Sequence, residues 1–140
     1  MLGDDIAAAL PELRAHAESL MRDRCVITDP TTAERAWDAA TGTYGPASPV
    51  TVYAGQCRVQ RGLGGTSDAQ AGGATWGVNA VSVQLPITPE SSMVRRGHVV
   101  RIVDIDPLTD ADLLEMQATV RAVPSKTHAV KRTLLCEEVA

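Results

Sequence analysis

The chain has 140 residues, with 44% apolar side chains and a formal net charge of −4, which suits one domain with a real core. Aromatic residues make up only 3% and phenylalanine is absent, so this core must be built from Val, Leu, Ile and Ala. The acidic balance argues against a free-standing DNA-binding module, but not against a protein that surrounds DNA without gripping it. No apolar run approaches the ~18–20 residues of a membrane helix. Asp4 and Asp5 lie where a signal peptide would have its basic segment. We therefore expect synthesis in the cytoplasm and no membrane partner.

The first segment predicts an amphipathic helix. Apolar residues recur at steps of three and four and share one face: Ile6, Leu10, Leu13, Ala17 and Leu20. Pro11 leaves two alternatives, because a proline inside a helix removes a hydrogen bond. Either the helix kinks there, or its main part starts near Leu10 with Pro11 in its first turn. We favour one helix that reaches about Arg22.

Beyond Arg22 the apolar period changes from 3.6 to 2, which predicts strands at residues 24–28, 50–60, 78–88, 99–106, 115–123 and 128–137. Alternation turns one apolar set inward: Cys25, Ile27, Cys57, Val59, Val81, Val83, Leu85, Ile87, Met116, Ala118, Val120, Ala122, Val130, Leu134 and Cys136. We expect Asp29-Pro30 to end the first strand, Gly55 to mark a bulge or bend, and Pro86 to lie at an edge or strand end.

These elements predict a mainly β fold, a small β-barrel or barrel-like sandwich with an N-terminal helix and a long glycine-rich loop. Residues 1–140 form a single domain in this interpretation, with the helix at 1–23 and the barrel at 24–140. Between the first two long strands, Trp37 and Tyr44 flank a short segment that contains Gly42. This pattern predicts a hairpin in which glycine supplies a positive φ.

Residues 61–77 interrupt the strand pattern. Six of these seventeen residues are glycine, and a loop of this length inside a small domain is usually functional or disordered. Trp76 favours a functional loop that anchors onto a partner, although packing on the barrel edge is the alternative. The candidate lumen or partner loop comprises Arg61, Gly62, Leu63, Gly64, Gly65, Thr66, Ser67, Asp68, Gly72, Gly73 and Trp76.

The sequence carries no catalytic or metal-binding signature. The histidines have no metal-ligand spacing, C-x-x-C and G-x-S-x-G are absent, and the three cysteines are widely spaced and expected to be buried, reduced thiols. The Asp104/Asp106 and Asp110/Asp112 pairs indicate a solvated acidic turn or, more weakly, a cation site. Two basic groups indicate solvated strand faces or, in a ring, a DNA-facing lumen: Arg95, Arg96 and Arg101, and Arg121, Lys126, Lys131 and Arg132. We predict no enzyme activity, no cofactor and no metal.

Five segments together resemble a known family. They are Leu10–Met21, Cys25–Thr28, Trp37–Tyr44, Val52–Val59 and Val94–Ile102. In these segments and its C-terminal strand pair, the chain resembles the head–tail connector proteins of actinobacterial phages and prophages, of the head-closure or stopper type.

The resemblance implies a virion protein of the neck with a small β-barrel and an appended helix. Such proteins form rings, commonly dodecamers, below the portal and adaptor, and they meet the tail terminator or tail tube on the other side. The ring encloses double-stranded DNA without reading its sequence. The helix residues Leu10, Leu13, Ala17 and Leu20 are then candidates for the ring interface, and loop 61–77 for a segment that closes the channel or contacts a neighbour. A tail terminator or tail-completion protein is the alternative, followed by a small β-barrel enzyme or a nucleic-acid-binding barrel.

Overall fold

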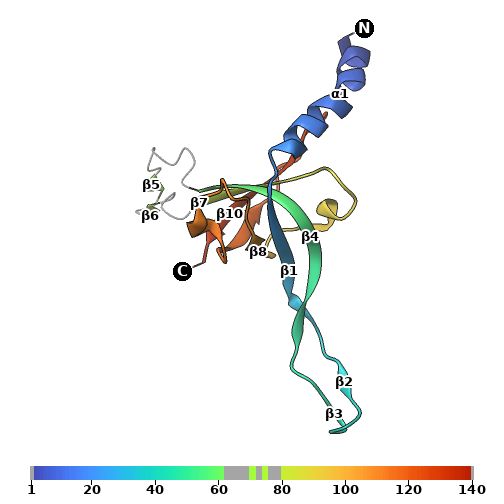
Figure 1. Ribbon diagram of the computed structural model, residues 1–140, viewed down its shortest axis with the longest axis vertical. Coiled ribbons are helices and arrows are strands. Elements are labelled where there is room, and N and C mark those ends of the chain that lie inside the picture. Colours follow the sequence, from blue (N-terminus) through green and yellow to red (C-terminus); the bar gives the residue numbers. More distant parts are fainter. Residues whose placement is uncertain (1, 62–69, 72–73, 76–79, 140) are drawn as a thin grey trace.

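A computed structural model describes residues 2–61, 70–71, 74–75 and 80–139 of the chain (Figure 1). Its elements in chain order are α1 (Leu2–Ser19), β1 (Asp23–Glu34), β2 (Trp37–Asp38), β3 (Thr43–Tyr44), β4 (Ser48–Arg61), β5 (Gln70–Ala71), β6 (Ala74–Thr75), β7 (Ala80–Leu85), the 3-10 helix η1 (Ser91–Met93), β8 (Val99–Asp104), the 3-10 helix η2 (Ala111–Leu113), β9 (Gln117–Ala122) and β10 (Arg132–Glu138).

Six of these strands close into an antiparallel barrel in the order β1-β4-β7-β10-β9-β8, and β8 returns to pair with β1. The prediction of a mainly β fold with an N-terminal helix is confirmed, and the sheet is a closed barrel. Closure pairs every strand of the wall on both sides, so the wall has no free edge in this part of the chain.

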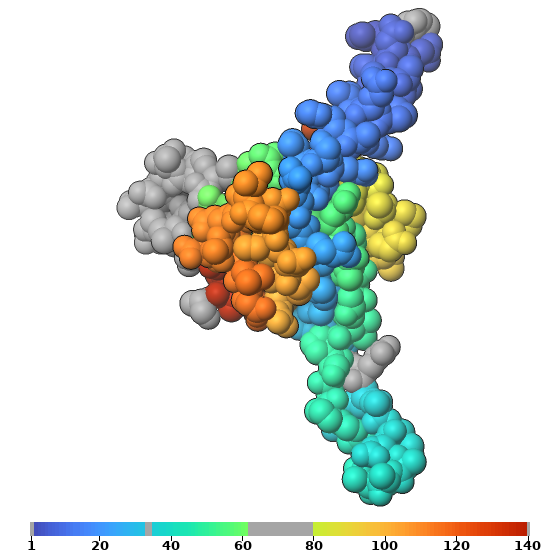
Figure 2. Space-filling model, viewed as in Figure 1, coloured from blue at the N-terminus to red at the C-terminus, as the bar shows by residue number. Residues whose placement is uncertain are grey.

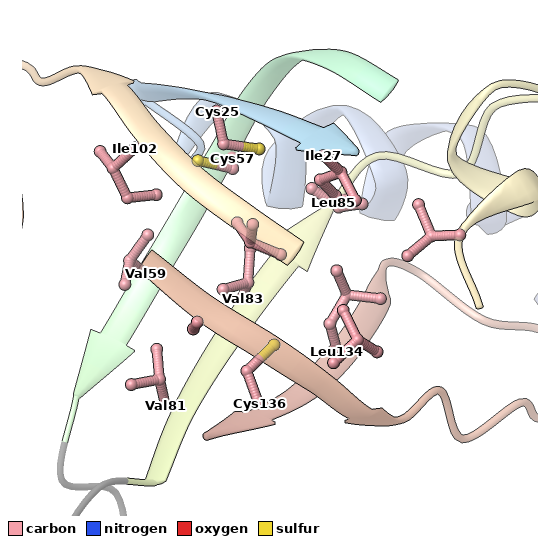
Figure 3. Close-up of a cluster of buried hydrophobic side chains, with 14 of the residues drawn as sticks. Cys25, Ile27, Cys57, Val59, Val81, Val83, Leu85, Ile102, Leu134 and Cys136 are labelled. Atoms are coloured by element: carbon pink, nitrogen blue, oxygen red, sulfur yellow. The ribbon is translucent and has the colours of Figure 1, made fainter. Parts of the chain in front are cut away.

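Alternating side chains fill the barrel interior, as the period of two predicts. Ile27, Leu85, Ile102 and Leu134 are fully buried there, and the other members of the core surround them (Figure 3). The predicted inward set is confirmed except at a few positions. Ala122 is exposed and Ile87 and Val130 are half-buried, because all three lie at or beyond the ends of their strands.

Strand β1 continues past Asp29-Pro30, where we expected it to end, and this prediction is wrong. The ladder to β4 shifts register between Asp29 and Ala33 and then resumes, so that Pro30 lies in a bulge where no ladder donor is needed. The Asp29 carboxylate holds the bulge by accepting hydrogen bonds from the backbone and hydroxyl of Thr31, at 2.9 and 2.7 Å, and from the hydroxyl of Thr32, at 3.0 Å.

Of the bulge or bend expected at Gly55, the bulge is wrong, because this glycine pairs in regular register with Cys25. Its role is to make room for the ring of Tyr53. A Cβ at Gly55 would lie 2.9 Å from the Tyr53 hydroxyl oxygen. That hydroxyl donates a 2.7 Å hydrogen bond to the carbonyl of Gln56, which fixes the ring across the glycine.

Helix α1 runs through Pro11 as one element, so the alternative in which the helix starts near Leu10 is wrong. It ends at Ser19, three residues before the expected end at Arg22. The residues between the helix and the start of β1 at Asp23 include Met21, which is buried. No helix in the described residues is long and apolar enough to cross a membrane.

Candidate interaction surfaces

The molecule is elongated because two elements project from the barrel in opposite directions. Helix α1 leaves at one end of the long axis, and the outer halves of β1 and β4 continue as a two-stranded arm at the other, tipped by β2 and β3 (Figures 1 and 2). We define the arm as residues 29–50. A two-stranded ribbon is marginally stable alone in water, so an arm of this kind favours contact with a partner.

Two aromatic side chains cover the tip of the arm. Trp37 and Tyr44 face each other across the β2–β3 pair, with ring centroids 5.1 Å apart and planes at 73°, an edge-to-face arrangement. Gly42 has a φ of 68° and closes the turn, which confirms the predicted hairpin. Trp37 is 58% exposed and Tyr44 60% exposed, so the pair presents apolar surface away from the barrel core.

Helix α1 is as poorly covered as the arm. None of its residues is buried, and Leu2, Ile6 and Leu13 are exposed. Among the predicted interface residues, Leu10 and Ala17 are half-buried, and Leu20 lies just beyond the helix and is 47% exposed. Most helices in folded proteins depend on packing of an apolar face, which the barrel does not supply here.

One hydrogen bond links the middle of α1 to the barrel. The Arg14 side chain donates from Nε to the carbonyl of Ala129 at 3.1 Å. Ala129 lies in the connection between β9 and β10, so this bond sets the base of the helix against that connection. No sequence pattern could predict this contact, since the two residues are 115 positions apart.

The candidate loop falls mainly outside the described residues. Arg61 is described, and it ends strand β4 and forms a 2.7 Å ion pair with Glu138 of β10. Within the loop, Gln70–Ala71 and Ala74–Thr75 pair as β5 and β6. The remaining members of the prediction lie outside the described residues: Gly62, Leu63, Gly64, Gly65, Thr66, Ser67, Asp68, Gly72, Gly73 and Trp76.

Two neighbouring grooves on the barrel are lined by basic side chains. One groove, of about 450 Å³, includes Arg95, Arg96 and Arg132, and the other, of about 270 Å³, includes Arg14, Lys126, His128, Lys131 and Arg132. Both grooves include Ser125 and Arg132, so they form one surface, and neither is lined by an acidic residue. We call Arg14, Arg95, Arg96, Lys126, Lys131 and Arg132 the basic face.

His98 and the three cysteines are buried in the barrel. His98 is buried and accepts a hydrogen bond at Nδ1 from the backbone of Arg95, at 3.1 Å. Cys25, Cys57 and Cys136 are free and buried, as predicted. Burial raises the pKa of the Cys136 thiol to about 12, and a contact with Cys25 together with burial raises the pKa of Cys57. Thiols held protonated in this way are poor nucleophiles.

The acidic pairs do not gather as ligands. Within the described residues, no three His, Cys, Asp or Glu side chains form a group that could hold a metal ion. Asp106 pairs with Arg22 at 2.9 Å, and Asp110 accepts a hydrogen bond from the backbone of Asp112 at the start of η2. Asp104, Asp110 and Asp112 are exposed, which is the solvated turn that the sequence favoured.

Comparison with known proteins gives a family and a fold. The sequence profile of a family of unknown function, DUF6093, matches residues 13–137. No curated protein matches the sequence. The solution structure of protein SF1141 from Shigella flexneri 2a is similar, with a TM-score of 0.51 over 86% of this chain and 94% of that chain. At 13% identity this likeness concerns the fold alone.

Proposed function

We propose that this chain, which belongs to the DUF6093 family, is a structural protein of a phage head–tail connector. In this role it forms a ring below the portal and adaptor, closes the DNA-filled head and joins it to the tail. The ring is a homo-oligomer, in the resembling family commonly a dodecamer, and it carries no catalytic activity. The virion neck is its location.

The observation that carries the proposal is the unequal packing of the molecule. The barrel is well packed, whereas α1 and the arm project from it with several large apolar side chains exposed. Exposed apolar surface on projecting elements favours protein–protein contact, and opposite projections let one subunit reach neighbours on two sides. A connector between head and tail needs contacts of this kind.

The resemblance of the sequence to connector proteins supports the same function. Two of the segments that carry it, Trp37–Tyr44 and Val52–Val59, form the arm tip and a stretch of β4 that crosses the barrel wall. The acidic net charge also suits a channel protein, because a negatively charged wall lets DNA pass without sticking.

Removal of the coding sequence from its phage genome tests the proposal. We expect the lysate to contain heads that have lost DNA beside separate tails of normal length, and expression of the wild-type chain in trans to restore virions. Tails of irregular length would instead indicate a tail terminator. Normal, infectious virions without the chain would refute the connector function.

A further inference from the structure

The charges of the barrel are divided between its two ends. The β7–β8 connection carries Arg95, Arg96 and a single acid, Glu90, and the β9–β10 connection carries Lys126 and Lys131 with no acid. The β8–β9 connection, residues 105–116, carries Asp106, Asp110, Asp112 and Glu115 with no lysine or arginine. We call these four residues and Asp104, the last residue of β8, the acidic loop.

Strand direction places these charges on opposite sides. Successive antiparallel strands reverse direction, so the β8–β9 connection lies at the other end of those strands from the β7–β8 and β9–β10 connections. Figure 2 shows the same separation, with the yellow β7–β8 connection and the orange acidic loop on opposite sides of β1 and β4.

The basic face forms no ion pair inside the described part of the subunit. Arginines elsewhere on the barrel form ion pairs: Arg22 with Asp106, Arg61 with Glu138, Arg101 with Glu115 and Arg121 with Glu137, at 2.7 to 3.1 Å. Among the described residues, no member of the basic face forms one. The chain places both of its lysines and four of its arginines there despite its acidic net charge.

The acidic loop is only partly neutralised. Arg22 pairs with Asp106 and Arg101 pairs with Glu115. Asp104, Asp110 and Asp112 form no ion pair with a described lysine, arginine or histidine. Leu108, at the turn of the same loop, is 88% exposed and adds an apolar contact.

From these two surfaces we infer that the basic face of one subunit binds the acidic loop of the next copy in the ring. The contact is head-to-tail, since it joins different surfaces of identical chains, and this is the geometry that generates a closed ring when the rotation is right. The inference rests on the proposed ring and names the surfaces that build it. Complementary charge steers association and fixes its register.

Charge-reversal variants test the contact. Arg96 and Lys126 are exposed and bond to no described side chain, so Arg96→Glu/Lys126→Glu reverses the charge at two positions of the basic face without breaking the fold. Asp104→Lys/Asp112→Lys reverses the charge at two positions of the acidic loop. Each variant then brings like charges together at part of the contact, and we expect both to self-associate more weakly than the wild-type chain. An equimolar mixture offers opposite surfaces again, and we expect it to recover the association of the wild-type chain.

Sedimentation velocity at about 0.01 M and about 1 M salt measures this association, because the screening length falls from about 30 Å to about 3 Å between them. We expect the wild-type chain to associate at low salt and to dissociate at high salt. The control Thr51→Glu/Ala54→Glu adds negative charge at exposed positions of β4, outside the arm and outside both surfaces, and should behave as wild type. Thermal unfolding of every variant checks that the barrel is intact.

Three results overturn the inference: a wild-type chain that stays monomeric at low salt, variants that associate as wild type, or a mixture that fails to recover. Binding of a duplex DNA probe that Arg96→Glu/Lys126→Glu abolishes, with self-association unchanged, assigns the basic face to DNA and also overturns it. A ring in virions that tolerates both reversals rejects this contact while leaving the connector function in place.

Discussion

Replacement of Trp37 by alanine separates the arm from the barrel most cleanly. The ring is 58% exposed, and its described aromatic neighbour is Tyr44 on the same hairpin, 5.1 Å away. An edge-to-face pair contributes about 0.5–1.5 kcal/mol, and here it stabilises the arm tip alone. We therefore expect Trp37→Ala to change the global free energy of unfolding by less than about 0.5 kcal/mol, the usual range for surface positions.

Leu134→Ala is the matched contrast. Leu134 is fully buried in the barrel, where it packs among β7, β9 and β10. Removing a buried leucine side chain costs about 2–5 kcal/mol, because transfer energy is lost and a cavity remains. Urea unfolding followed by circular dichroism measures both variants, with the midpoint and slope fitted separately.

Loss of the aromatic pair at the arm tip should impair virion assembly although the barrel stays folded. Trp37→Ala/Tyr44→Ala folds normally but fails to restore virions when supplied in trans, because the arm has lost its contact surface. If Trp37→Ala lowers stability as much as Leu134→Ala, the arm tip packs on the core, and its independence from the barrel is refuted. If the double variant restores virions fully, the arm tip makes no contact that assembly needs.

Three further predictions concern the barrel. Gly55→Ala should lower the free energy of unfolding by about 1–3 kcal/mol, because the added methyl group overpacks against Tyr53. The loss should be smaller in a Tyr53→Phe background, which lacks the crowded hydroxyl. Equal losses in both backgrounds would contradict this prediction. Hydrogen bonds from the side chain and backbone of Thr31 lower the pKa of Asp29 from 3.8. The stability that this carboxylate contributes is therefore present above pH 3.8 and is lost as the pH falls below it. In an acid unfolding titration monitored by fluorescence, Asp29→Asn should remove this loss of stability below pH 3.8. Burial raises the pKa of the Cys136 thiol from 9.0 to about 12, so the stability that the buried thiol contributes is present below pH 9.0 and is lost as the pH rises toward 12. At neutral pH a thiol reagent should modify Cys136 only in the unfolded protein. Labelling of the folded protein at the same rate would refute the burial of this thiol.

The sequence predicts the barrel because its signals are local. Alternation of apolar residues along each strand, for example Val81, Val83 and Leu85, reflects the two faces of a strand and needs no knowledge of the partner strand. The hairpin at Trp37–Tyr44 follows in the same way from its aromatic flanks and from Gly42 at the turn.

The arm and the basic face cannot be predicted in this way because they depend on residues that are far apart in the sequence. Strand β1 passes Pro30 only because Asp29 can hold a bulge and β4 offers a partner beyond it. The basic face gathers Arg14 from the helix, Arg96 from one connection and Lys126 from another. The sequence predicts that these charged side chains are exposed, but only the folded structure shows that they lie together.

Cryo-electron microscopy of intact virions, with this chain located in the map, tests whether the chain forms a connector ring. We expect a ring between portal and tail, with the arm and α1 of each subunit seated against neighbouring proteins and the basic face of one copy against the acidic loop of the next. A chain found at the tail tip, or virions that lack it altogether, would contradict the connector function.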